Sequence, residues 1–459
     1  MKKFFSLIAL TISFLTFSTD AADAPRPNIV FILVDDLRWD ALGCMGHPFS
    51  KTPHIDRIAK EGALFKNFFV TLPLCSPSRA SFLTGQYAHK NGIIDNAPRV
   101  EQSHQLVTFP KLLRDSGYES GYVGKWHMGN DSSKRPGFDY WVCLPGQGQY
   151  ENPMLNVNGT SAKVPGYVTD ILSEHAVKFI KQERAKPFVL YLSHKSVHGP
   201  FTPAERHKNL YADVKVTPPP SVSASLEGKP VLTREQEDVR PPRPKKKGKG
   251  DSTVQKQYPP GTMLQQLRAL ASIDDGVGQI FAALEQTKQL DNTVFVFTSD
   301  NGYFWGEHGL GDKRWAYEES IRDPLVVRYP KLVKAGKKIE EMVLNIDVAP
   351  TLLELGGAKI PKGVQGESFV PLLKGERVKW RHSGLFEYFQ EKNFSRTPTW
   401  HAVRTERWKY IQYTDLTGMD ELYDLKNDRF EMKNLINSSS ARKPLKEMKS
   451  ELVRLQKKY

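Results

Sequence analysis

The sequence predicts an α/β fold: a doubly wound, mostly parallel sheet covered by helices, followed by a smaller C-terminal α+β subdomain. Three apolar runs rich in β-branched and aromatic residues indicate strands buried on both faces, at Asn28–Val34, 188–192 and 293–298. Helical patterns separate these runs, at 52–61, 168–184 and 263–288. Strands that alternate with helices favour a parallel sheet, because each parallel connection needs a crossover.

Polar side chains follow each of these predicted strands. Asp35 and Asp36 come directly after the first, His198 lies shortly after the second, and Asp300 and Asn301 come directly after the third. Ligands of open α/β sheets bind beyond the carboxyl ends of the strands, so we expect an active site there. Four hard oxygen donors suit Ca²⁺ or Mg²⁺ rather than zinc, although such Asp-Asp and Asp-Asn-Gly runs, taken alone, are more often turns.

The N-terminus has the pattern of a secretory signal peptide over residues 1–22. Lys2 and Lys3 precede an apolar run at 4–17, which is shorter than the roughly 20 residues of a membrane span. No later segment of the 459-residue chain is long and apolar enough to span a membrane. We therefore expect an exported protein, periplasmic or secreted, without a membrane span.

After the signal peptide, we expect a catalytic domain over residues 23–374 and a C-terminal subdomain over 375–459. Residues 212–260 resemble an inserted loop, because they are rich in Pro, Lys and Glu and show little periodicity. The subdomain is indicated by strand-like pieces at 385–389, 408–413 and 421–425 and by an amphipathic helix at about 442–457.

The formal net charge of +14 includes a short basic run inside the predicted insertion, formed by Arg240, Arg243, Lys245, Lys246, Lys247 and Lys249. Such a run is most often a solvated loop, and the alternative is a patch that gathers a polyanion such as a sulfated glycan. Nucleic acid is the least expected partner, because the sequence contains no nucleic-acid-binding motif.

Three cysteines are too few for a disulfide framework. We expect Cys44 and Cys143 to be buried thiols, and a bond between them is the alternative. Cys75 differs, because Pro77 fits the first turn of a helix and Gly85 fits its end. A cysteine at a helix N-terminus lies where an anion is favoured, and Arg79 projects from the same face. Taken alone, this pattern is also compatible with a reactive thiol or a thiol-based phosphatase.

The full run from Cys75 to Gly85, CSPSRASFLTG, resembles the signature of the sulfatase family, in which the cysteine is oxidised to formylglycine by a formylglycine-generating enzyme. The resemblance covers most of the chain and implies an alkaline phosphatase-like fold. It also implies one Ca²⁺, held by Asp35, Asp36, Asp300, Asn301 and the converted Cys75.

Further catalytic residues are implied by the same resemblance. The run GKWHMG at 124–129 is similar to the segment in which Lys125 contacts sulfate and His127 holds the formylglycine hydrate. His198 lies in an H-x-P-F context, and Lys313 matches the second sulfate-binding lysine. For His308 two roles stay open, a substrate contact or the shaping of a loop.

These parts suit sulfate ester hydrolysis. Arg79, Lys125, Lys313 and Ca²⁺ can neutralise charge on the sulfate oxygens, and a protonated His198 can donate to the leaving alkoxide. A hydrated aldehyde offers two hydroxyls on one carbon, one to attack sulfur and one to release sulfate afterwards, with His127 assisting the second step.

The C-terminal portion is similar to that of bacterial carbohydrate sulfatases related to N-acetylglucosamine-6-sulfatases, which act on glycosaminoglycans or mucin-type glycans. Trp400, His401 and Arg404 are therefore candidate sugar contacts, although a Trp and a His in a strand more often serve packing. The alternatives are a sulfatase of another specificity, iduronate-2-sulfatase-like or an arylsulfatase, and a phosphonate or phosphate ester hydrolase of the same superfamily. A non-catalytic binder of sulfated polysaccharide is disfavoured, because every member of the constellation is present.

Overall fold

The computed structural model describes residues 26–234 and 260–459, so the predicted signal peptide and the basic run at 240–249 lie outside the described residues. A ten-stranded sheet forms the centre, in the order β12-β2-β11-β8-β1-β7-β3-β4-β5-β6. Its strands are β1 (Asn28–Val34), β2 (Ala63–Phe69), β3 (Glu119–Lys125), β4 (Tyr140–Leu144), β5 (Met154–Val157), β6 (Thr160–Lys163), β7 (Phe188–Ser193), β8 (Thr293–Ser299), β11 (Leu325–Arg328) and β12 (Lys337–Leu344).

The middle of this sheet is parallel, as predicted, and its margins are mixed. β8, β1, β7, β3 and β4 pair in parallel. β11 runs antiparallel to both β8 and β2, and β5 and β6 add antiparallel pairs at the other margin. The carboxyl ends of the five central strands therefore meet at one edge.

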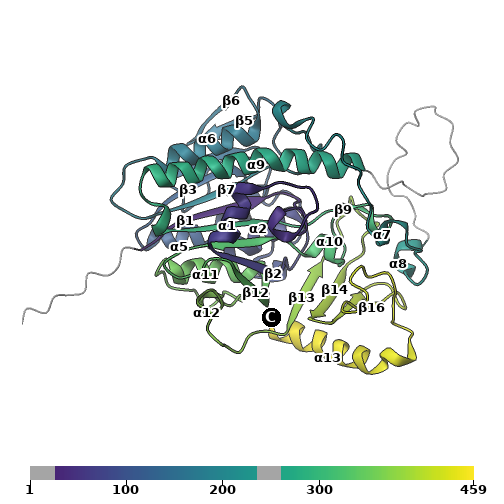
Figure 1. Ribbon diagram of the computed structural model, residues 1–459. Coiled ribbons are helices and arrows are strands. Elements are labelled where there is room, and N and C mark those ends of the chain that lie inside the picture. Colours follow the sequence, from purple (N-terminus) through teal and green to yellow (C-terminus); the bar gives the residue numbers. More distant parts are fainter. Residues whose placement is uncertain (1–25, 235–259) are drawn as a thin grey trace, which may run out of the picture.

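Helices cover both faces of the sheet (Figure 1). Alternate residues of β1 explain the two layers: Val30, Ile32 and Val34 pack with α1 (Pro53–Glu61), α6 (Val168–Ile180) and α9 (Pro260–Gln286). Ile29, Phe31 and Leu33 pack on the other side with α2 (Cys75–Thr84), α5 (Phe109–Asp115) and α11 (Val348–Leu355). The doubly wound arrangement is thus confirmed, with α6 ending four residues before the predicted boundary.

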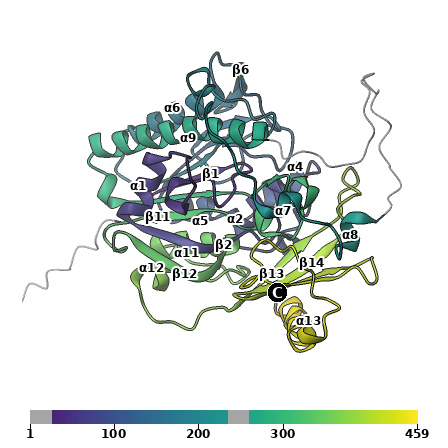
Figure 2. The ribbon, with the colours of Figure 1, turned by 45° about the vertical axis from the view of Figure 1, so that its right-hand side comes forward.

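The C-terminal part forms a separate four-stranded antiparallel sheet, beside which α13 lies in both views (Figures 1 and 2). The strands are β13 (Ser383–Tyr388), β14 (Trp400–Thr405), β15 (Trp408–Tyr413) and β16 (Glu421–Asp424), and the helix is α13 (Arg442–Lys458). β14 was not among the three strand-like pieces predicted for the subdomain, although Trp400 and His401 were taken to lie in a strand. One apolar cluster joins this sheet to the large domain, because Leu385 and Phe386 pack with Phe69 and Leu72.

Short elements complete the described chain: α3 (Ala88–Asn91), α4 (Val100–Gln105), α7 (Pro220–Ser223), α8 (Pro230–Thr233), β9 (Phe304–Trp305), β10 (Gly311–Asp312), α10 (Glu318–Ile321) and α12 (Val370–Lys374). Two of them correct the prediction of a plain loop over 212–260. α7 and α8 lie in its described half, and Val231 and Leu232 belong to the C-terminal core. Among the described residues, no helix combines the length and apolarity needed to cross a membrane.

Candidate active site

Cys75 begins α2, a helix whose ten residues are all buried. Leu74 is extended before it, and Gly85 ends it at φ 68°, as the sequence predicted. The backbone N–H groups in the first turn of a helix have no partner within the helix. In α2 one of them, the Ser76 N–H, donates to Asn96 Oδ1 at 3.0 Å. Burial, together with the charge of Asp35, raises the pKa of the Cys75 thiol to about 12. An unmodified Cys75 is therefore a protonated thiol and a poor nucleophile.

Three carboxylates gather beside Cys75 because β1 and β8 are parallel neighbours, with Val34 opposite Ser299. Oxygen atoms of Asp35, Asp36 and Asp300 all lie within 4.8 Å of one another. Burial and the charge of Asp35 raise the pKa of Asp300 to about 7. Three ionised carboxylates at these strand ends would therefore repel one another.

Each carboxylate also meets a cation. Lys125 Nζ donates to Asp35 and Lys313 Nζ to Asp36, and Arg79 pairs with Asp300 at 2.7 Å. Burial alone would raise the pKa of Asp35, but the charges of Lys125, His198 and Arg79 hold it well below its usual range. Lys313 Nζ is also 3.1 Å from Cys75 Sγ, which brings one of these cations to the cysteine itself.

The oxygen donors fit a hard cation. Asn301 Oδ1 is buried and has no hydrogen-bond partner among the described residues, whereas its Nδ2 donates to Asp36 at 2.7 Å. Asp35, Asp36, Asp300 and the amide oxygen of Asn301 together suit Ca²⁺. A second group, Asp35, Cys75 and His198, also lies within ligand distance but mixes soft and hard donors. An acid-rich oxygen cage therefore agrees better with calcium than with zinc.

Two histidines flank the cysteine from other strands. His127 follows β3; its Nδ1 lies 3.3 Å from Ser76 Oγ and its Nε2 lies 2.8 Å from Gln147 Nε2. Burial and the charge of Lys125 hold the pKa of His127 well below its ordinary value, so it is neutral at pH 7. His198 Nδ1 lies 3.0 Å from the Gly199 carbonyl, to which it can only donate, so Nε2 faces Asp36 at 3.8 Å.

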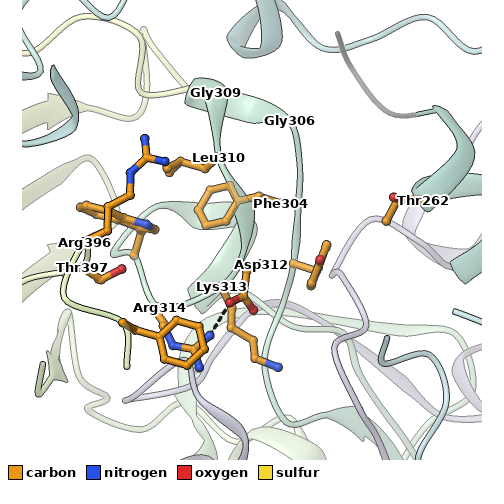
Figure 3. A pocket seen from close by; sticks show the side chains of 14 residues that line it. Thr262, Phe304, Gly306, Gly309, Leu310, Asp312, Lys313, Arg314, Arg396 and Thr397 are labelled. Carbon is orange, nitrogen blue, oxygen red and sulfur yellow. Dashed lines mark hydrogen bonds and ion pairs between the residues drawn. The ribbon is translucent and has the colours of Figure 1, made fainter. Parts of the chain in front are cut away.

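A cavity of about 570 Å³ begins at Lys313 (Figure 3). Its lining includes the turn Asp312, Lys313 and Arg314, and three residues from the segment between β13 and β14, namely Phe394, Arg396 and Thr397. Arg314 is 3.4 Å from the centre of the Phe394 ring and donates to Glu391 at 2.6 Å. The C-terminal subdomain therefore contributes a wall of the space next to Lys313.

The four residues suggested as substrate contacts lie elsewhere, since none belongs to the described lining of this cavity. His308 is buried and stacks on Tyr317 at 4.4 Å, which agrees with its role in shaping a loop. Trp400 is fully buried, with its indole N–H donating to the Arg314 carbonyl, and Arg404 is in a buried ion pair with Glu318 at 2.9 Å. His401 is partly buried beside Phe389. Trp400 and Arg404 are thus placed for packing and not for sugar contact.

Several supporting residues were missed by the sequence reasoning. Ser193 Oγ accepts from Arg79 at 2.6 Å and donates to the Lys125 carbonyl at 2.9 Å. Ser193 lies at the carboxyl end of β7, and this position could have marked it as a site residue. Nothing in the sequence marked Gln147 or Asn96 in this way. Cys44 and Cys143 are free thiols, as the favoured interpretation expected, but only Cys143 is fully buried and Cys44 is partly exposed.

Comparisons with known proteins agree with this geometry. The sulfatase family model matches residues 27–358, and a model described as "N-sulphoglucosamine sulphohydrolase, C-terminal" matches residues 306–458. An N-acetylglucosamine-6-O-sulfatase of Bacteroides thetaiotaomicron is 32% identical over 95% of this chain and 87% of its own length.

Solved structures share the fold. One, of a protein in complex with its substrate D-glucosamine-2-N,6-O-disulfate, superposes with a TM-score of 0.85 at 31% identity, over 95% of this chain and 98% of its own. A phosphonate monoester hydrolase of Agrobacterium radiobacter gives a TM-score of 0.76 at 22% identity, over 94% and 95%, which shows the fold alone.

Fold and matches together define a hydrolase of sulfuric esters with an alkaline phosphatase-like architecture. The chain belongs to the sulfatase family.

Proposed function

We propose that the protein is an exported carbohydrate sulfatase that removes the 6-sulfate of glucosamine residues in glycosaminoglycan or mucin-type glycans. The observation that carries this proposal is the cavity of about 570 Å³ that opens at Lys313 and is walled by the C-terminal subdomain. A space of this size holds a sugar. The relatives reported above act on, or bind, 6-sulfated glucosamines, and residues 1–22 would direct export.

The catalytic group would be formylglycine derived from Cys75, made by a formylglycine-generating enzyme. As a hydrate, formylglycine would supply two hydroxyls on one carbon, one as the nucleophile toward sulfur and the other for the later release of sulfate. Asp35, Asp36, Asp300, Asn301 and the converted residue 75 would hold one Ca²⁺, which neutralises charge on the sulfate.

The chain's own residues perform the remaining steps. Lys125, Lys313 and Arg79 surround the sulfate position, where buried cations stabilise the charge that develops on its oxygens. His127 is neutral and can accept a proton from the hydrate. Because Nδ1–H of His198 donates to the Gly199 carbonyl, Nε2 is the nitrogen that faces the site, and it carries a proton for the leaving sugar oxygen in the imidazolium form. Burial lowers the pKa of His198 to about 4, and a bound anion would favour its protonated form.

The proposed substrate is tested by measuring the turnover of several esters under the same conditions. We expect glucosamine 6-sulfates to be hydrolysed much faster than uronate 2-sulfates, galactose sulfates, a phosphodiester or a phosphonate ester. Activity on uronate 2-sulfates alone would contradict the specificity, and preferential turnover of the phosphonate would favour the alternative hydrolase.

Peptide mass spectrometry tests the nucleophile. The active enzyme should carry formylglycine at position 75, and Cys75→Ala should lose turnover while the unfolding temperature stays near that of the unconverted protein. Full activity from an intact Cys75 thiol would overturn the mechanism.

A further inference from the structure

Helix α13 is strongly basic, with seven exposed lysines and arginines and two glutamates. Four of the cations follow the spacing i, i+4, i+7 and i+15, so they share one side of the helix, while Met448, Leu452 and Leu455 are buried on another. We call these four residues the basic face of α13: Arg442, Lys446, Lys449 and Lys457. Because an α-helix rises 1.5 Å per residue, the face is about 22 Å long.

The charges of the basic face are not neutralised within the described part of the chain. None of its four cations forms an ion pair with a carboxylate of residues 26–234 or 260–459, whereas Arg454 and Lys458 of the same helix do, at 2.7 and 3.5 Å. Lys449 lies over the Tyr410 ring, 5.5 Å from its centre, a contact that leaves its positive charge uncompensated. The face therefore presents a row of free positive charges to solvent.

Helix stability does not explain this row. Cations near the C-terminus of a helix, such as Lys457, are favoured by the macrodipole. At the N-terminus the same dipole opposes positive charge, yet the first turn of α13 contains Arg442 and Lys443 and no acidic residue. A local choice that weakens the element on which it lies is expected at functional sites. The start of α13 therefore indicates a role outside the fold.

The basic face is separate from the cavity beside Lys313. α13 packs against β13, β14 and β15, and in Figure 1 the C-terminal sheet lies between α13 and β9, whose Phe304 lines the cavity. None of the four cations belongs to the described lining of that cavity. A ligand on this face would therefore contact the enzyme in addition to the sugar in the cavity, and not in its place.

We propose that the basic face of α13 is a second, non-catalytic binding site that holds a sulfated polysaccharide chain on the enzyme. The inference rests on the proposed function, in which the hydrolysed sugars are units of such a chain, and goes beyond it. A sulfated polysaccharide repeats its anionic groups along its length, which matches a straight row of cations. Lysine and arginine form charge-assisted hydrogen bonds with the oxygens of such groups.

The test compares the full-length wild-type protein with a variant in which all four residues of the basic face are changed to Gln. We expect the Kd for heparin, a highly sulfated polysaccharide, to rise by about tenfold or more, with a weaker dependence on salt. The Kd for a heparin disaccharide should change little, because a disaccharide cannot span the row. Turnover of a 6-sulfated glucosamine monosaccharide should stay at the wild-type rate.

A matched control removes the same number of charges from the opposite end of the molecule, on and beside β6 and α6. Its four exposed lysines, each changed to Gln, are Lys163, Lys178, Lys181 and Lys186. This control should keep the wild-type Kd for heparin. Residues 240–249 are unchanged in all three proteins, so any contribution of that basic run cancels in the comparison.

The outcomes separate this inference from the proposed function. An unchanged Kd for heparin in the α13 variant, or an equal rise in the control, would overturn the inference while 6-sulfatase activity stands. Duplex DNA that binds as tightly as heparin, with the same loss in the α13 variant, would show a general polyanion surface and refute the assignment to sulfated polysaccharide. Wild-type protein that turns over no 6-sulfated glucosamine would overturn the proposed function, since heparin binding is measured without turnover.

Discussion

Asp36 and His127 have left-handed backbone conformations, with φ of 61° and 65°. Such conformations cost non-glycine residues on the order of 1 kcal/mol or more, and Asp and His tolerate them better than most. Each residue comes just after a strand, and there the Asp36 carboxylate meets Lys313 and Asn301, while the His127 ring meets Ser76, the residue after Cys75. The sequence identified both residues, but their backbone conformation depends on packing that no local pattern encodes.

His198 provides the residue-scale prediction. A sugar alkoxide is a poor leaving group, so it needs a proton donor far more than an activated nitrophenolate does. His198→Ala should therefore lose ~10²-fold or more in kcat on a glucosamine 6-sulfate and much less on an activated aryl sulfate. Steady-state kinetics on both substrates provide the measurement. Equal losses would show that His198 binds sulfate and is not the acid.

At the scale of elements, the parallel pairing of β8, β1, β7 and β3 places their carboxyl ends side by side. That is why Asp300, Asp35 and Lys125, far apart in sequence, meet at one point. The apolar runs predicted β1, β7 and β8, and with them the location of the site. β11 was not predicted, because its antiparallel insertion between β8 and β2 has no signature in its own four residues.

The carboxylates that follow β1 and β8 predict that both turnover and stability depend on calcium. Three carboxylates within 4.8 Å should bind Ca²⁺ more readily than Mg²⁺, which demands tighter octahedral geometry. Chelation should abolish turnover and lower the unfolding temperature, and added Ca²⁺ should reverse both. Asp300→Ala should lose the Ca²⁺-dependent rise in unfolding temperature seen by calorimetry. Stoichiometric zinc in the purified active enzyme would contradict this assignment.

At the scale of the whole molecule, buried charges join the two sheets. Glu318 of α10 pairs with Arg404 of β14 at 2.9 Å and with Lys409 of β15 at 2.8 Å, and Lys409 also pairs with Glu431 at 2.8 Å. The resemblance to carbohydrate sulfatases suggested Arg404 as a sugar contact. An arginine in a strand gives no sign of which buried acid it will meet. Only the packing of the C-terminal subdomain on the large domain shows that partner.

Arg404→Ala should consequently affect stability and not substrate binding. Removing one partner of a buried pair leaves an uncompensated charge, which costs about 3–5 kcal/mol. We expect a clearly lower midpoint in denaturant, with KM for the sugar unchanged in the protein that remains folded. Arg407→Ala is the control, since the Arg407 side chain that pairs with Asp424 is half exposed. A raised KM without loss of stability would instead support a role in sugar binding.

The complete burial of α2 has a consequence for how the enzyme is made. Cys75 has no exposed surface, and the nine helical residues after it are buried as well. If Cys75 is converted to formylglycine as proposed, the converting enzyme would need this segment as an accessible stretch of chain, so the oxidation would have to precede folding. The proposed modification would then be a matter of timing: a molecule that folded first would stay inactive, however stable, until it was unfolded again.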